Sequence, residues 1–261
     1  MTAIDKYEID VLPPEKQGSG EFDNGKITEI KPIDFPHGTG RGKRIGPLFY
    51  WAWASANGDG IIGMHPHQAF EIISYVLKGE IGHTDSLGNK TRVGEGGAQI
   101  MQTGSGVYHQ EEMYGERTEF FQIWFEPNLN ETIKTKPTYR QLTDEEFPVD
   151  EFDGGSVKKI LGEGSPIKLV ADSKMEEIQI DPGKSYLLNQ GSDRLKAIVV
   201  IAGKGKLSLD NEKHDILKEY YITLKSGEPI STEISNTGNE KLILAIVEVP
   251  LNVNYKLYGE E

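Results

Sequence analysis

Two short triplets in the first half of the chain carry residue types that bind transition metals. The first is a His-Pro-His triplet with His65 and His67, and the second is a His-Gln-Glu triplet with His109 and Glu111. Side chains alternate between the two faces of a β-strand, so the two ligand types in each triplet would share one face. Two neighbouring strands would then direct three imidazoles and one carboxylate to one point. This set suits a divalent transition metal and leaves coordination positions for water or substrate.

Each triplet has an ordinary explanation when it is taken alone. A His-x-His pair is often two surface histidines, or one core histidine beside an exposed one, and a His-x-Glu pair is usually a polar strand edge. The chain has six histidines, and three of them fall in these two triplets, which are one hairpin-rich unit apart. The combination therefore favours a metal site.

The composition narrows the classes of protein and of partner. A length of 261 residues suits one large β unit or two domains of ordinary size. The net charge of −13 argues against direct binding of nucleic acid through a basic face, and it would suit a basic protein partner. The chain has no cysteine, which excludes disulfides and thiolate ligands. No signal peptide and no apolar run of the ~18 residues that a spanning helix needs is evident, so we expect a cytoplasmic protein without membrane association.

Short strands are predicted through most of the chain. Residues 27–33 and the aromatic run 48–54 each have strand length, and glycine-rich turns divide residues 64–125 at intervals of about 8–12 residues. The same rhythm returns after residue 165. It is typical of an all-β sandwich or barrel.

The second half of the chain resembles a repeat of the first. The sequence around Gly203 echoes the sequence around Gly79, and the two glycines lie 124 residues apart. At that spacing Asn189 and Gly191 take the places of the first two histidines. We therefore expect the second half to lack metal ligands.

The motifs between the two triplets resemble those of the pirin family, within the cupin superfamily. The resemblance rests on the triplets and on Phe70-Glu71, Tyr75-Val76-Leu77, Gly79-Glu80-Ile81, His83, Asp85-Ser86-Leu87-Gly88-Asn89, Gln99 with Met101, and Gly104-Ser105-Gly106. Pro137, Tyr139 and Gln141 resemble the inter-domain connector of the family. These motifs cover about a quarter of the chain, and the two-domain plan matches over most of it.

The resemblance implies an all-β bicupin, in which two jelly-roll-type β-barrels pack face to face. Residues 1–131 would form an N-terminal metal-binding barrel, residues 132–164 a connector, and residues 165–261 a C-terminal cupin-like barrel without metal ligands. The residues that match the metal ligands of the family are His65, His67, His109 and Glu111.

The resemblance also implies a function, a quercetin 2,3-dioxygenase-like oxidoreductase that acts with dioxygen on a flavonol or a related aromatic hydroxyketone. The expected cofactor is one divalent metal, with Fe(II) first and Mn, Ni, Co, Cu or Zn as alternatives. Glu111 could hold the metal, or leave it and act as a base on the substrate hydroxyl. The family commonly has Arg-Gly after the second histidine and Phe-Pro before the first, where this chain has Gln68-Ala69 and Gly63-Met64.

Two other functions use the same ligand set. One is a non-catalytic metal-binding sensor that binds a protein partner, and the other is a metal-dependent cupin isomerase. We expect Phe70, Met101 and Trp124 to hold a flat substrate, which would favour the dioxygenase. Glu71 is interpreted as a supporting residue and not a ligand, although a ligand role remains an alternative. His83 is interpreted as an exposed strand histidine.

Overall fold

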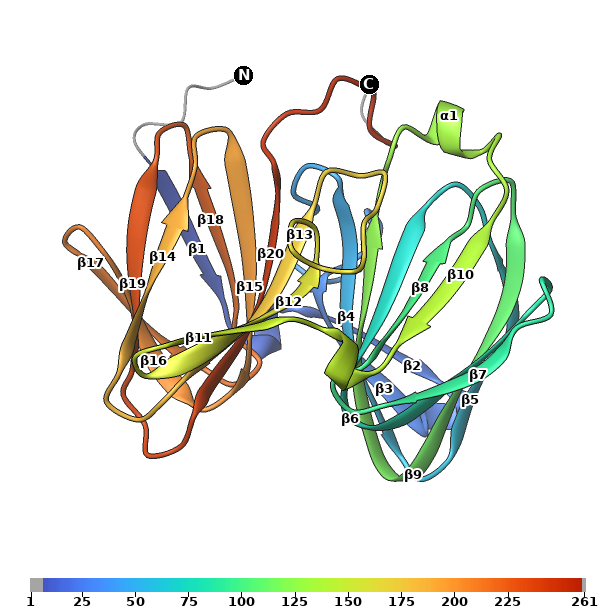
Figure 1. The fold of residues 1–261 in the computed structure, drawn as a ribbon, viewed down its shortest axis with the longest axis horizontal. Helices are drawn as coiled ribbons and strands as arrows, with labels where there is room; N and C mark the ends of the chain where they lie inside the picture. Colours follow the sequence, from blue (N-terminus) through green and yellow to red (C-terminus); the bar gives the residue numbers. More distant parts are fainter. Residues whose placement is uncertain (1–6, 260–261) are drawn as a thin grey trace. The chain divides into compact units, whose positions relative to one another are not determined.

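The structure is a computed structural model that describes residues 7–259, and its contacts divide the chain into two units (Figure 1). The N-terminal unit holds Lys16–Glu146, Leu169–Ala171 and the described residues from Asn254 onward. The C-terminal unit holds the described residues up to Glu15, Phe147–Lys168 and Asp172–Val253. Nearly all of the regular secondary structure in each unit is β-strand, so the all-β prediction is confirmed.

A nine-stranded antiparallel sheet forms the N-terminal unit. The strands follow the order β10-β8-β6-β9-β4-β3-β2, while β5 pairs with β9 and β7 pairs with β6. The bounds are β2 (Gly18–Phe22), β3 (Ile27–Ile33), β4 (Leu48–Asn57), β5 (Gly60–His67), β6 (Glu71–Asp85), β7 (Lys90–Gly94), β8 (Ala98–Gln102), β9 (Val107–Phe125) and β10 (Thr138–Leu142).

Two antiparallel sheets form the C-terminal unit. One has the order β1-β18-β15-β20-β13-β12-β11 and the other the order β14-β19-β16-β17. The bounds are β1 (Tyr7–Leu12), β11 (Val149–Phe152), β12 (Gly155–Leu161), β13 (Lys174–Ile180), β14 (Ser185–Gln190), β15 (Arg194–Ala202), β16 (Lys204–Leu209), β17 (Glu212–Leu217), β18 (Tyr221–Ser226), β19 (Ile230–Asn236) and β20 (Leu242–Pro250).

The long strand β9 bends back on itself and so supplies two walls of the N-terminal unit. Its first half pairs with β5 and its second half with β4. Gln122 Nε2 donates a hydrogen bond to Glu111 Oε1 at 2.7 Å, although an extended strand would separate the two residues by roughly 36 Å. Gly115 lies between them with φ +94°, a conformation that side-chain-bearing residues rarely adopt. The bend therefore brings the inward faces of the two halves together.

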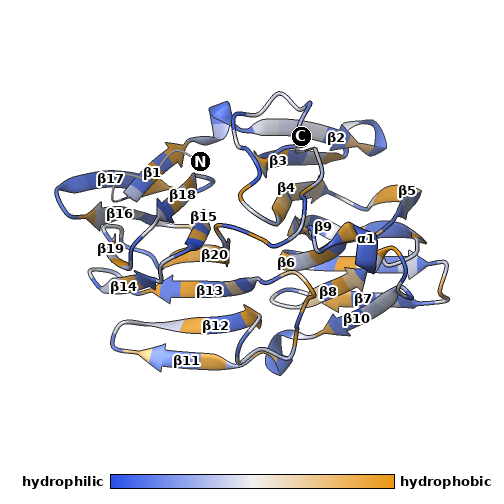
Figure 2. Ribbon diagram, turned by 90° about the horizontal axis from the view of Figure 1, so that it is seen from above, coloured by the Kyte–Doolittle hydropathy of each residue, from blue (hydrophilic) through white to orange (hydrophobic). Residues whose placement is uncertain are grey.

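Burial follows strand pairing in both units. Figure 2 shows hydrophobic residues concentrated in strands such as β4 and β20, and most residues of both strands are buried. The one α-helix within residues 7–259 is α1 (Leu129–Thr132), a single turn. The described part of the chain contains no helix that is long and apolar enough to cross a membrane. The cytoplasmic location stays a prediction.

The unit boundaries cut across the chain order. The first described strand, β1, pairs with β18 of the C-terminal unit, whereas β10 pairs with β8 of the N-terminal unit. The division into a metal-binding barrel (1–131), a connector (132–164) and a barrel without metal ligands (165–261) stays a prediction.

The predicted repeat has a structural counterpart at its two glycines. Gly79 and Gly203 have φ values of +78° and +80°. A Cβ atom would lie 2.6 Å from the carbonyl oxygen of Arg117 at the first glycine and 2.5 Å from that of Lys241 at the second. Both positions therefore need a residue without a side chain, for the same two reasons.

The offset of 124 residues does not hold on β14. Asn189 and Gly191 are exposed, whereas Leu188 and Gln190 are buried and lie opposite Thr232 and Ile230. The prediction that Asn189 and Gly191 occupy the positions of His65 and His67 in the repeat is therefore wrong. A shift of one residue reverses the face of every side chain on a strand, and a sequence offset without a known gap cannot detect it.

Candidate metal centre

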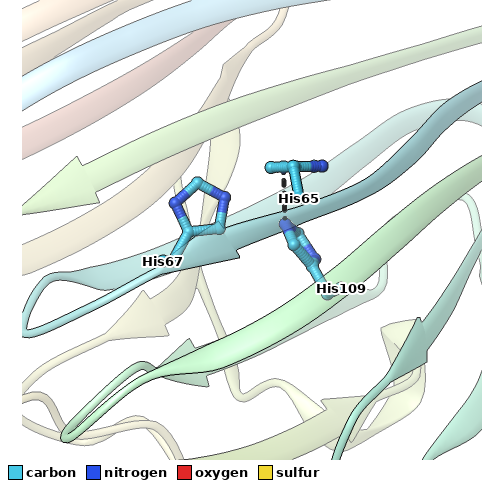
Figure 3. Close-up of side chains that lie close together, drawn as sticks. All are labelled: His65, His67 and His109. Atoms are coloured by element: carbon cyan, nitrogen blue, oxygen red, sulfur yellow. Dashed lines mark hydrogen bonds between the residues drawn. The ribbon is translucent and has the colours of Figure 1, made fainter.

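His65 and His67 lie on β5 and His109 lies on the first half of β9, and Figure 3 shows the three imidazoles gathered between these strands. In the register, His65 is paired with His109. The pairing shifts between Ile62 and His65, so a bulge precedes the first histidine and changes the direction of the strand there. Pro66 has no N–H to donate to a neighbouring strand. It is tolerated here because β5 pairs only with β9 and is an edge strand.

The three histidines are close enough to bind one ion. One ligand nitrogen from each lies within 4.8 Å of the others, and the Nε2 atoms of His65 and His109 are 3.0 Å apart. Two imidazole nitrogens at right angles around one metal, each at ~2.1 Å, would be roughly 3 Å apart. The spacing of these two nitrogens therefore fits a shared metal ion.

His67 supplies a second sign that a ligand belongs here. Its Nε2 atom is buried and has no hydrogen-bond partner within the described residues. The indole ring of Trp124 packs edge-on to its imidazole, with ring centroids 4.7 Å apart and an interplanar angle of 89°. A buried polar atom without a partner is costly, and a metal ion would satisfy it.

Hydrogen bonds fix which nitrogen His65 presents. Its Nδ1 lies 2.8 Å from the carbonyl oxygen of Gly63, which can only accept, so Nδ1 carries the proton. The lone pair is then on Nε2, the atom that faces His109. Metal-binding histidines are commonly oriented in this way.

A buried pair behind His109 orients the third imidazole. Asp85 Oδ2 lies 2.8 Å from His83 Nε2, and His83 Nδ1 lies 3.4 Å from His109 Nδ1. When His83 donates from Nε2 to the carboxylate and accepts at Nδ1 from His109 Nδ1, the lone pair of His109 is on Nε2. His83 is 3% exposed and stacks on Tyr139 at 4.0 Å, so its interpretation as an exposed histidine is wrong.

Two of the imidazoles are held in the neutral form. Burial, together with the neighbouring His109 and His65, lowers the pKa of His67 to about 3. Burial, together with His65 and His83, lowers the pKa of His109 to about 3. At neutral pH both rings therefore keep a free lone pair, as metal binding requires.

Glu111 lies in the same unit but is not part of the three-ligand group. Its Oε1 accepts hydrogen bonds from Gln122 Nε2 at 2.7 Å and from Ser74 Oγ at 3.4 Å. Burial raises the pKa of its carboxyl, against the opposing charge of His65. The side chain faces the cavity described next, so a metal-binding role for Glu111 stays a prediction.

The site opens into a cavity of about 320 Å³. Its lining is largely aromatic and aliphatic, with two carboxylates and two of the histidines: Phe22, Glu29, Phe35, Tyr50, Ile62, Gly63, His65, His67, Glu111, Gln122 and Trp124. A cavity of this kind suits a flat apolar ligand with a few polar groups.

The predicted walls of the cavity are partly wrong. Trp124 lines it, but Phe70 and Met101 do not. Phe70 packs against the ring of Phe49 at 4.9 Å, and Met101 is buried in a core cluster. Both residues are close to a histidine triplet in the sequence. Closeness along the chain does not determine which side chains line the cavity.

Sequence reasoning missed the wall on β3 and β4. Tyr50 and Glu29 line the cavity, and Tyr50 is paired with Trp124 across β4 and β9. The signal was available in part, because residues 27–33 and 48–54 were predicted as strands. The missing information was that these two strands cover the histidines.

Glu71 has a structural role away from the histidines. Its Oε1 accepts from Val170 N at 2.8 Å and from Gln102 Nε2 at 2.6 Å, and its Oε2 accepts from Ala171 N at 2.9 Å. These bonds pin Leu169–Ala171 to the N-terminal unit. The interpretation as a supporting residue agrees with this geometry.

Comparisons with known proteins find similarity over the part of the chain that holds the site. The family model described as Pirin matches residues 52–125, which hold all three histidines. A pirin-like protein of Caulobacter vibrioides is 31% identical over 156 residues, which cover 56% of this chain and 56% of that protein. The chain thus spans little more than half the length of this curated relative.

Two solved structures show the same fold. Quercetin 2,3-dioxygenase from Acinetobacter baumannii gives a TM-score of 0.79 at 19% identity, covering 98% of this chain and 91% of that chain. The bacterial pirin of Escherichia coli in complex with nickel(II) gives 0.74 at 22% identity, covering 93% and 99%. The predicted resemblance to pirins and quercetinases, and the two-unit cupin architecture, are confirmed.

Proposed function

We propose that this chain, which carries a pirin-family domain, is a metal-dependent dioxygenase of quercetinase type. The proposed substrate is a flavonol or a related aromatic hydroxyketone, and the proposed cofactor is Fe(II). His65, His67, His109 and Glu111 are the proposed ligands.

One observation carries the proposal. Three imidazoles converge beside a cavity of about 320 Å³ with aromatic walls, and the buried Nε2 of His67 has no partner within residues 7–259. A site that bound metal only for structure would have no need of a ligand-sized cavity beside it. The relatives and neighbours with quercetinase names support the reaction class.

A bound Fe(II) ion would supply Lewis acidity and electrons for reaction with dioxygen. The protein supplies the surroundings. Tyr50 and Trp124 shield the space in front of the histidines from water and can hold a flat ring. Reactions of charged or reduced species depend on such exclusion of water.

Glu111 is proposed as a base as well as a ligand. Burial raises the pKa of its carboxyl, which brings its proton affinity closer to that of a substrate hydroxyl. Gln122 Nε2 fixes its orientation by a hydrogen bond at 2.7 Å. Glu111 can therefore take the proton of an enolic hydroxyl that lies in the cavity and hold it on a carboxylate oxygen.

The two alternatives fit the cavity less well. A sensor that only binds metal needs no enclosed space for a ligand, and an isomerase of sugars or keto acids needs polar walls. Here four of the lining residues are aromatic rings other than histidine, namely Phe22, Phe35, Tyr50 and Trp124. The dioxygenase is therefore the better-supported function.

The test is oxygen consumption by metal-reconstituted protein. Protein stripped of metal and reloaded with Fe(II) should consume dioxygen when a flavonol is added, and the stripped protein should not. Separate loading with Mn(II), Ni(II), Co(II) and Cu(II) identifies the active metal. A metal-replete protein that consumes no dioxygen with any member of a flavonol panel would contradict the proposal and favour the sensor.

A further inference from the structure

The cavity contains a second buried carboxylate that the proposed chemistry does not use. Glu29 lies on β3, lines the cavity and is 6% exposed. It pairs with Ala54 of β4, which pairs with Phe120 in the second half of β9. Glu29 therefore shares the inward face of the wall that carries Tyr50 and Trp124, whereas the histidines lie on β5 and the first half of β9.

The carboxylate of Glu29 has only long contacts. Tyr50 Oη lies 3.4 Å from Oε1 and 3.3 Å from Oε2, and Lys31 Nζ lies 3.6 Å from Oε2. Hydrogen bonds from a hydroxyl to a carboxylate are ordinarily about 2.5–2.7 Å long. Burial raises the pKa of Glu29, although Lys31 opposes the shift. The group can therefore accept a further, shorter hydrogen bond from a ligand in the cavity.

The position of this carboxylate is built into the sheet. Gly20 on β2 pairs with Glu29, and a Cβ atom at Gly20 would lie 2.8 Å from Glu29 Oε2 and 2.8 Å from Lys31 Nζ. The absence of a side chain at Gly20 leaves space for both charged groups. Tyr50, in turn, is held by the ring of Phe35, which stacks on it at 4.4 Å and 17°.

The walls around Glu29 limit the chemistry of its ligand. Phe35, Tyr50 and Trp124 present aromatic surface, and Phe35 meets Trp124 edge-on at 5.5 Å. The cavity also holds two carboxylates, Glu29 and Glu111, and no lining lysine or arginine among the described residues. Such a lining disfavours carboxylate or phosphate groups and suits a flat ring that carries hydroxyl donors.

We propose that Glu29 determines specificity by accepting a hydrogen bond from a phenolic hydroxyl on the part of the substrate that lies away from the histidines. This inference rests on the proposed function, because it assumes that the reacting end of the ligand faces the metal. The histidines lie on β5 and β9 and Glu29 on β3, yet His65, His67 and Glu29 line one cavity of about 320 Å³, so a single ligand can face the histidines and Glu29 together. A compound with two linked ring systems would place its chelating ring at the histidines and its second ring at Glu29.

A carboxylate in this position distinguishes ligands by whether they donate a hydrogen bond to it. An analogue without the hydroxyl would cover Glu29 with apolar surface and leave the buried carboxylate without the new bond. Sites that hydrogen-bond a substrate hydroxyl reject analogues that lack it much more strongly than apolar pockets reject an extra group. Because the cavity is partly open to solvent, we expect a moderate preference of roughly 10- to 100-fold.

The experiment compares two ligands that share the metal-chelating ring. Nickel(II)-loaded full-length protein is titrated without oxygen, by calorimetry, with 3-hydroxyflavone and with 3-hydroxyflavone that carries 3′- and 4′-hydroxyls. The wild type should bind the hydroxylated compound 10- to 100-fold more tightly. In Glu29→Gln this ratio should fall below about threefold.

Metal content and thermal unfolding of the variant show whether it is folded and loaded, and the ratio in the wild type tests the inference even if the variant fails to fold. Equal affinities in the wild type, or an unchanged ratio in Glu29→Gln, would overturn the inference. Oxidation of both compounds with equal efficiency would also overturn it and leave the proposed function intact. Preferential binding without oxidation of either compound would leave the inference and remove the proposed function.

Discussion

The C-terminal unit fills its interior with aliphatic side chains, whereas the N-terminal unit leaves a cavity of about 320 Å³ beside three histidines. The buried faces of β14 and β19 in the C-terminal unit carry Leu188, Gln190, Thr232 and Ile234. Both units turn at an equivalent glycine, Gly79 or Gly203. The comparison shows that one strand plan can be a packed body or a ligand site, depending on a few inward-facing residues.

The second difference concerns histidine–carboxylate pairs two residues apart on a strand. His83 and Asp85 on β6 are buried and lie 2.8 Å apart, whereas His214 and Glu212 on β17 are near the surface and 3.5 Å apart. The buried pair contacts His109, whereas the surface pair lies on β17, an edge strand of the C-terminal unit. Substitutions at His214 and Glu212 therefore provide matched controls for substitutions at the site.

The largest effect is expected from loss of a metal ligand. His67→Ala should weaken metal binding by more than roughly 100-fold. Loss of a residue that only orients a ligand already lowers metal affinity by roughly 10- to 100-fold. The fold should remain, because the unit has an apolar core of its own. Competition with a coloured chelator measures the affinity, and His214→Ala is the control. Full metal occupancy in His67→Ala would contradict the assignment.

The next effect separates the roles of Glu111. Glu111→Gln keeps an oxygen and most contacts of the side chain but removes the base, so flavonol turnover should fall by roughly 100-fold or more. The metal content should fall by less than the turnover. Glu233→Gln, on the exposed face of β19, is the control. Turnover that falls only in proportion to lost metal would show that Glu111 is a ligand and not a base.

A smaller effect is expected from the residue behind His109. His83→Phe should preserve the ring that stacks on Tyr139 but remove the contact with His109 Nδ1, which weakens metal binding by roughly 10- to 100-fold. His214→Phe in the C-terminal unit should leave the affinity unchanged. Equal metal affinities in wild type and His83→Phe would mean that the Asp85–His83 pair does not orient His109.

The smallest effect is on the pH dependence of the metal-free protein. The pKa of His67 is lowered to about 3 in the folded state, from about 6.5 in the unfolded chain, so the unfolded state binds more protons between these values. This contribution to stability is present above pH 6.5 and is lost as the pH falls toward 3. Relative to His67→Gln, metal-free wild type should lose about 2 kcal/mol of unfolding free energy between pH 7 and pH 5. Parallel denaturation midpoints for the two proteins over this range would contradict the shift.

The sequence predicted that His65 and His67 lie on one face of a strand, because that prediction needs only local information. Strand parity placed His65 and His67 on one face, and no knowledge of other strands was needed. Glu29, Tyr50 and the burial of His83 depend on which strands cover which face, and pairing between β3, β4 and β9 is a long-range property. The error at Asn189 has the same origin, because a register of one residue is set by the partner strand.

The most direct test of the account is the location of the metal by anomalous scattering in crystals of metal-loaded protein, together with elemental analysis of the same sample. The account predicts one metal ion per chain, within about 2.0–2.3 Å of a nitrogen of each of His65, His67 and His109. A stoichiometric ion in the C-terminal unit, or a metal-saturated sample with no ion at these three histidines, would contradict it.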